Sequence, residues 1–176
     1  MRRVAALAIA ALALASAVAA WSRVRVNWTS SMPIGLYLET PVDLEREELV
    51  FVCLPEAIAQ VGRARRYLPT GGCPNRTSPV LKQVLALPGD RVDLREDFLA
   101  VNGIEVEGSR IRALDSLERP LDHASYGRRT VQEGELWVVG LNRERSWDSR
   151  YFGPIPVASV VGAVRAVLTL PSAGSK

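Results

Sequence analysis

The chain has 176 residues, a formal net charge of +3 at pH 7 and a hydrophobic share of 48%. This length suits one domain with a short appendage, and it is large enough to bury a core. Basic and acidic residues are interspersed, and no stripe of Arg or Lys with interleaved aromatic residues occurs, which argues against nucleic-acid binding. The two cysteines are too few to form a zinc site by themselves.

The N-terminal segment is hydrophobic. Two arginines at 2–3 precede an apolar run at 4–21 that holds a single serine. About 18 apolar residues can just span a bilayer as an uncleaved anchor. The alternative is a cleaved signal peptide, because Ala-Val-Ala at 17–19 has the small-x-small form of a cleavage site. We expect a signal or anchor segment at 1–22, favour the anchor, and place the domain at 23–176 outside the cytoplasm.

Two adjacent serines, Ser30 and Ser31, follow a strand pattern at 24–28. Pro33 restricts the backbone after them and Gly35 permits unusual angles, so this loop has a defined shape. A nucleophilic serine needs such a fixed, exposed position, and it needs a base.

Short strand patterns dominate the rest of the domain, with one helix expected at 56–67. The polar residues at 108–130 predict a long irregular excursion. The many short strands indicate a mainly β, antiparallel domain. We expect strands at 34–38, 48–54, 80–87, 91–94, 134–140 and 159–170, and a hairpin at 98–106 with an Asn-Gly turn at 102–103.

The two cysteines, Cys53 and Cys73, flank the expected helix and a loop at 68–75. If the domain lies outside the cytoplasm, they can form a disulfide that closes this segment. The alternative is a pair of buried free thiols.

Two residues are candidates for the base. His123 lies in a polar stretch beside Asp122, but adjacent residues do not normally face each other, so we interpret it as a surface histidine. Lys82 lies in the apolar run at 80–87 and is one of only two lysines. A lysine can lose its proton when it is buried, which requires its pKa to fall from about 10.4 by roughly three units. The alternative is an edge-strand lysine that extends to water.

A third polar cluster, Ser-Trp-Asp-Ser-Arg at 146–150, reads by itself as an ordinary polar loop. Together with two other segments it resembles the three signature motifs of the type I signal peptidases, in the family's order. The form Ser-Met-Pro-x-Gly-x-Tyr is most similar to the TraF-type branch, the conjugative-transfer peptidases. The three segments are SMPIGLY at 31–37, LKQVLALPGD at 81–90 and SWDSRYFGP at 146–154.

The resemblance implies a Ser-Lys endopeptidase that uses no metal and no cofactor. It makes Ser31 the nucleophile, with Ser30 as the second candidate, and Lys82 the general base. The backbone N–H of Ser31 and the hydroxyl of Thr29 are expected to form the oxyanion hole. Leu141 occupies a position where the family more often has an acidic residue. Whatever this acidic residue does in other members is therefore absent here or is done by another residue.

The same resemblance assigns supporting roles. Ser146 is expected to orient the Lys82 amine, and Asp148 and Arg150 to form an ion pair that braces the site. Residues expected to line a small pocket for Ala-like side chains are Met32, Val80 and Leu81.

The expected substrate is an exported protein with a signal or pro-segment, with a conjugative pilin precursor favoured. The expected location is the bacterial inner membrane, with the catalytic domain on the periplasmic side. Two alternatives remain: a general leader peptidase, and a non-catalytic component of an envelope conjugation or secretion machine. Self-cleaving repressors share the chemistry but carry a DNA-binding domain instead of a membrane segment.

Overall fold

The computed structural model describes residues 21–170, which form a mainly β, antiparallel domain as the strand patterns predict. The expected signal or anchor segment at 1–22 lies almost wholly outside the described residues. Within 21–170, no helix is both long and apolar enough to cross a membrane.

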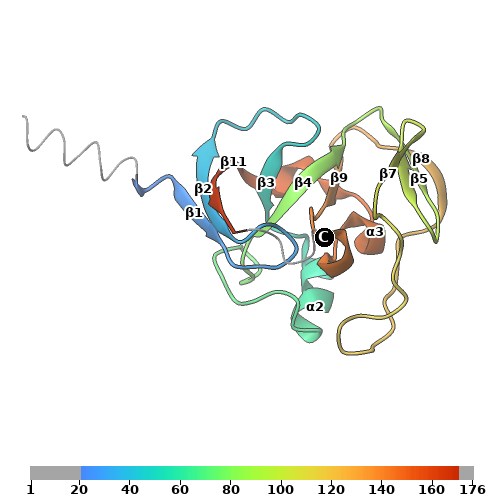
Figure 1. Cartoon of the computed structure of the whole chain (residues 1–176), viewed down its shortest axis with the longest axis horizontal. Helices are drawn as coiled ribbons and strands as arrows, with labels where there is room; N and C mark the ends of the chain where they lie inside the picture. Colours follow the sequence, from blue (N-terminus) through green and yellow to red (C-terminus); the bar gives the residue numbers. More distant parts are fainter. Residues whose placement is uncertain (1–20, 171–176) are drawn as a thin grey trace, which may run out of the picture.

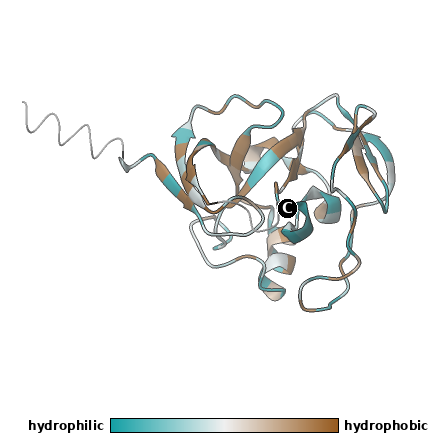
Figure 2. Ribbon diagram, viewed as in Figure 1, coloured by the Kyte–Doolittle hydropathy of each residue, from teal (hydrophilic) through white to brown (hydrophobic). Residues whose placement is uncertain are grey.

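A seven-stranded antiparallel sheet forms the centre of the domain (Figure 1). Its two central strands, β3 and β4, are rich in apolar residues, and Figure 2 shows the hydrophobic colouring gathered on them and on β9. The last described strand, β11, inserts between β2 and β3, so these two strands are joined in the sheet only through long-range pairing. In spatial order the strands are β1 (Val24–Asn27), β2 (Gly35–Thr40), β11 (Val160–Thr169), β3 (Leu49–Val52), β4 (Val80–Ala86), β9 (Glu135–Val139) and β10 (Ile155–Pro156).

A second sheet has four strands in the order β7-β6-β5-β8. The expected hairpin is confirmed, because Asn102 and Gly103 take positive φ values of 53° and 85° between β6 and β7. Strand β8 lies in the region expected to be irregular. Its sequence, Gly-Arg-Arg-Thr, is mostly exposed and has no apolar alternation to predict an edge strand. The four strands are β5 (Arg91–Leu94), β6 (Leu99–Val101), β7 (Ile104–Val106) and β8 (Gly127–Thr130).

Two α-helices lie in the described part of the chain. Helix α2 (Glu56–Ala64) ends three residues before the expected boundary, because Arg66 turns the chain with a φ of 60°. Helix α3 (Ser149–Phe152) was not expected; Asp148 caps it by accepting a hydrogen bond from the Arg150 N–H. Two short 3₁₀ helices are η1 (Arg143–Arg145) and η2 (Val157–Ser159).

The described residues include a disulfide between Cys53, just after β3, and Cys73, in the loop before β4. The excursion at 108–126 is held against the end of α2 by Asp115. Its carboxylate binds Arg119 at 2.7 Å and accepts a hydrogen bond from the Tyr67 hydroxyl. These contacts keep the excursion close to the end of α2, and Leu114 and Leu121 of the excursion line the cavity described below.

Candidate active site

Ser31 lies in the loop between β1 and β2, and its side chain is half-buried. The Ser31 carbonyl accepts a hydrogen bond from the Asn142 N–H at 3.0 Å. The Thr29 hydroxyl lies 3.5 Å from Ser31 Oγ and donates to Asn27 Oδ1 at 2.7 Å. The serine is therefore held from both sides, by its own loop and by the segment that follows β9.

Lys82 projects from the central strand β4 and is only 3% exposed. Its Nζ atom lies 3.3 Å from Ser31 Oγ and 2.9 Å from Ser146 Oγ. Burial lowers the pKa of Lys82 to about 8; the charge of Asp148 opposes this shift and the charge of Arg150 adds to it. About one tenth of the amine is then neutral at pH 7, which is the form that accepts a proton.

Ser146 follows η1 and is buried against the lysine. Gly140 makes this approach possible. A Cβ atom at Gly140 would lie 2.3 Å from Ser146 Oγ and 2.7 Å from the Ser31 carbonyl oxygen. Only a glycine therefore lets the segment after β9 come so close to both serines.

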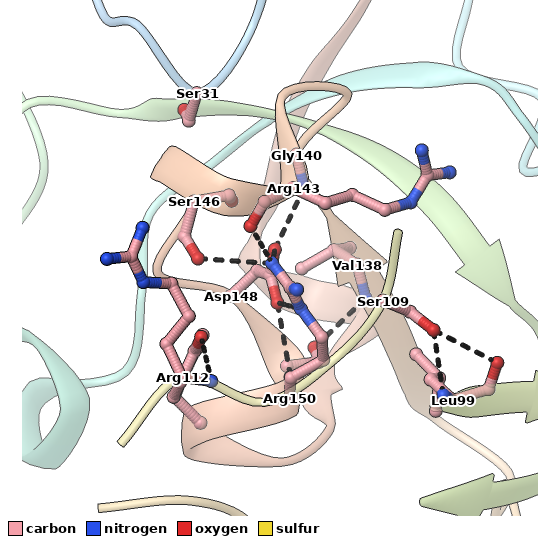
Figure 3. A network of polar contacts seen from close by, with 12 residues as sticks. Ser31, Leu99, Ser109, Arg112, Val138, Gly140, Arg143, Ser146, Asp148 and Arg150 are labelled. Carbon is pink, nitrogen blue, oxygen red and sulfur yellow. Dashed lines mark hydrogen bonds and ion pairs between the residues drawn. The ribbon is translucent and has the colours of Figure 1, made fainter. Parts of the chain in front are cut away.

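Asp148 and Arg150 form a fully buried ion pair beside Ser146 (Figure 3). Arg150 Nε donates to Asp148 Oδ1 at 2.8 Å, and its Nη2 donates to Asp148 Oδ2 at 2.9 Å. The same Nη2 donates to the carbonyls of Arg143 at 2.6 Å and Ser146 at 3.2 Å. Asp148 Oδ2 also accepts from the Gly140 N–H at 3.1 Å. The pair thus joins both sides of the loop that carries Ser146.

Burial and the neighbouring charges have opposite effects on the pKa of Asp148. Burial alone raises the pKa of Asp148, but the charge and hydrogen bonds of Arg150, helped by Lys82, leave that pKa lowered. Asp148 is therefore ionised at neutral pH and supplies a fixed negative charge near the lysine.

A cavity of about 600 Å³ opens beside these residues. Ser31, Lys82 and Ser146 face it, and so does the exposed Ser30. Its apolar wall consists of Leu54, Leu68, Val80, Leu114, Leu121, Trp147 and Tyr151. A cavity of this size can hold several side chains of an extended peptide.

Two of the three residues expected at the pocket lie elsewhere. Val80 lines the cavity, but Met32 and Leu81 are each 1% exposed and pack into a core cluster with Tyr37 and Val164. Successive side chains of a strand point to opposite faces, so Leu81 must face away from the side shared by Val80 and Lys82.

His123 is not part of the site. It is exposed, its ring stacks on Tyr126 at 4.1 Å, and Nδ1 lies 2.8 Å from the Ala124 carbonyl. Within residues 21–170, no group of three His, Cys, Asp or Glu side chains could hold a metal ion.

Two further residues that shape the site are not among the candidates that the sequence motifs indicate. Asn27 organises the serine loop, and Gly140 allows the close approach of the two serines. The pattern Asn-x-Thr directly before the serine pair is a local turn signal that could have pointed to Asn27. No local signal points to Gly140, because its neighbours come from distant segments.

Comparison with known proteins identifies the family. The family model described as signal peptidase, peptidase S26, matches residues 1–169. A conjugal transfer protein TraF of Agrobacterium fabrum is 40% identical over 150 residues, 82% of each chain. A plasmid transfer protein TraF of Escherichia coli is 32% identical over 161 residues, covering 91% of this chain and 90% of its own. A signal peptidase I of Bacillus caldolyticus is 34% identical over 113 residues, 59% of this chain and 61% of its own. The chain therefore belongs to the signal peptidase family, peptidase S26, whose activity is of the serine endopeptidase kind.

Proposed function

We propose that this protein is a membrane-associated serine endopeptidase in which Ser31 is the nucleophile and Lys82 the general base. The observation that carries the proposal is the position of one buried amine. Lys82 Nζ lies 3.3 Å from Ser31 Oγ and 2.9 Å from Ser146 Oγ, and its pKa is lowered to about 8.

The proposed reaction begins with neutral Lys82. The amine donates one N–H to Ser146 Oγ, which turns its lone pair toward the Ser31 hydroxyl. Lys82 takes the Ser31 proton as Oγ attacks the scissile carbonyl, and then gives that proton to the leaving amine. The acyl-enzyme is hydrolysed by a water molecule that Lys82 deprotonates in the same way.

The proposed oxyanion hole consists of the Ser31 N–H and the Thr29 hydroxyl. In the free protein this hydroxyl donates to Asn27 Oδ1 at 2.7 Å. A tetrahedral oxyanion carries a full charge and accepts a stronger hydrogen bond than a neutral amide oxygen. The hydroxyl is therefore expected to turn from Asn27 to the oxyanion during the reaction.

The proposed substrate is an exported protein with a signal or pro-segment, specifically the precursor of a conjugative pilin subunit. Two relatives carry names that refer to conjugal or plasmid transfer, which favours this substrate. We also propose that the segment at 1–22 anchors the protein in the bacterial inner membrane with residues 23–176 in the periplasm. The Cys53–Cys73 disulfide fits an oxidising compartment.

The test is intact-mass analysis of a co-expressed pilin precursor with wild type, Ser31→Ala, Lys82→Ala and Ser30→Ala. We expect cleavage by wild type and by Ser30→Ala, and none by the other two. Cleavage by Ser31→Ala but not by Ser30→Ala would reassign the nucleophile. A product one water lighter than the hydrolysed chain would show that the new C-terminal carbonyl has formed an amide with an amine of the same chain.

The two alternative functions give different results. A general leader peptidase would cleave an unrelated secretory preprotein as efficiently as the pilin precursor. A non-catalytic component would cleave neither, and Ser31 would not react with a fluorophosphonate probe. Protease treatment of spheroplasts tests the location, because a periplasmic domain is digested while the membrane is intact.

A further inference from the structure

The Asn27 side chain is the hub of the loop that carries Ser31. It is the last residue of β1 and only 3% exposed. Its Nδ2 donates to the carbonyls of Thr29 at 3.0 Å, Met32 at 3.2 Å and Pro33 at 3.0 Å. One carboxamide therefore holds carbonyls on both sides of the serine, inside the loop between β1 and β2.

The other end of the carboxamide controls Thr29. Asn27 Oδ1 accepts from the Thr29 N–H at 3.2 Å and from the Thr29 hydroxyl at 2.7 Å. The reverse orientation of the carboxamide would set Oδ1 against three carbonyl oxygens, so the contacts determine which end is which. The Thr29 hydroxyl donates its single proton to Asn27, so a lone pair of its oxygen faces Ser31 Oγ at 3.5 Å.

The same pattern of contacts occurs once more in the described residues, in the loop between α2 and β4. Asn75 Oδ1 accepts from the Thr77 N–H at 3.2 Å and from the Thr77 hydroxyl at 2.6 Å, while Nδ2 donates to the Leu54 carbonyl at 2.8 Å. Asn75 is thus a matched control: it makes the same Asn-x-Thr contacts, but it does not touch the loop of Ser31.

We propose that Asn27 is a positioning residue for the reaction: its carboxamide fixes the backbone on both sides of Ser31, and in the free protein it also holds the Thr29 hydroxyl. This inference rests on the proposed function, because it assigns Asn27 a role in the reactivity of Ser31. Asn27 does not touch Lys82 in the described contacts, so its loss should slow the reaction without changing the lysine's titration.

The experiment measures the second-order rate of Ser31 labelling by a fluorophosphonate probe, read by intact mass, across a range of pH. We expect Asn27→Ala to label about 100-fold more slowly, since a misplacement of about 1 Å costs a factor of that size. The pH midpoint of labelling should stay at the wild-type value. Asn75→Ala should label within about threefold of wild type although it also loses a half-buried carboxamide and its hydrogen bonds.

A second variant covers the case in which Asn27→Ala does not fold. Asn27→Ser keeps a hydroxyl near Thr29 but is too short to reach the carbonyls of Met32 and Pro33, so it should also label slowly. Wild-type labelling rates in folded Asn27→Ala or Asn27→Ser would overturn this inference and leave the proposed function standing. A shifted pH midpoint would also overturn it, because the defect would then lie at the lysine. An unlabelled wild-type protein would overturn both proposals.

Discussion

At the scale of single residues, the chemistry depends on the proton of Lys82. Burial lowers its pKa to about 8, and only the neutral amine can take the Ser31 proton. We therefore predict that kcat/KM for precursor cleavage rises with pH and levels off above about pH 8. Initial rates between about pH 6 and about pH 10 test this. Lys82→Arg should be inactive at every pH, since a guanidinium keeps its proton. A flat profile would contradict the assignment of Lys82 as the base.

The charges around Lys82 set where this profile lies. Asp148 raises the pKa of Lys82, so removing its charge in Asp148→Asn should move the midpoint of the pH–rate profile to lower pH. The same change leaves the buried Arg150 without a counter-charge and should cost about 3 to 5 kcal/mol of stability.

Rates of Asp148→Asn should be measured at a temperature where circular dichroism shows it folded. Glu133→Gln is a suitable control, because it removes one acidic charge outside the buried cluster and should leave the midpoint unchanged. A midpoint that moved to higher pH in Asp148→Asn would show that the carboxylate acts on the lysine in some other way.

At the scale of elements, the site depends on how closely the segment after β9 approaches the serine loop. In Gly140→Ala the new Cβ would lie 2.3 Å from Ser146 Oγ and 2.7 Å from the Ser31 carbonyl oxygen, so both must shift. We predict a fall in kcat of about 100-fold with a small change in KM, because the catalytic groups move apart while most of the cavity is untouched.

The matched control is Gly162→Ala in β11, where a Cβ would meet no atom within 4 Å. It should retain kcat within about twofold. Normal activity of Gly140→Ala would show that this segment can withdraw without separating Ser31, Lys82 and Ser146.

At the scale of the whole molecule, one covalent link supports the wall of the cavity. The Cys53–Cys73 disulfide spans 20 residues of sequence and joins the end of β3 to the loop before β4. The double variant Cys53→Ala/Cys73→Ala should lose about 3 kcal/mol of unfolding free energy, measured by urea denaturation. A reductant should destabilise wild type by a similar amount and leave the double variant unchanged. Equal stability with and without the link would mean that the sheets alone hold this wall.

The topology of the molecule places the motifs together. Lys82 comes from a central strand, Ser31 from the loop before β2, and Ser146 from the segment after β9. Strand β11 pairs with both β2 and β3, and it thereby joins the strand after Ser31 to the strands that include β4 with Lys82. The site is therefore a product of long-range pairing rather than of any one segment.

The mainly β class, most strands and the Asn102-Gly103 turn could be predicted from the amino-acid sequence, because alternation of apolar residues and turn chemistry are local properties. The resemblance of its motifs also pointed to Ser31, Lys82 and Ser146, and the structure places Lys82 Nζ within hydrogen-bond distance of both serine hydroxyls. The burial of Met32 and Leu81 in the core could be seen only in the folded molecule, because a side chain's environment depends on the register of its strand and on what packs against it. The tertiary structure alone revealed strand β8, helix α3 and the roles of Asn27 and Gly140, because their partners are set by the packing of the folded chain and not by sequence pattern.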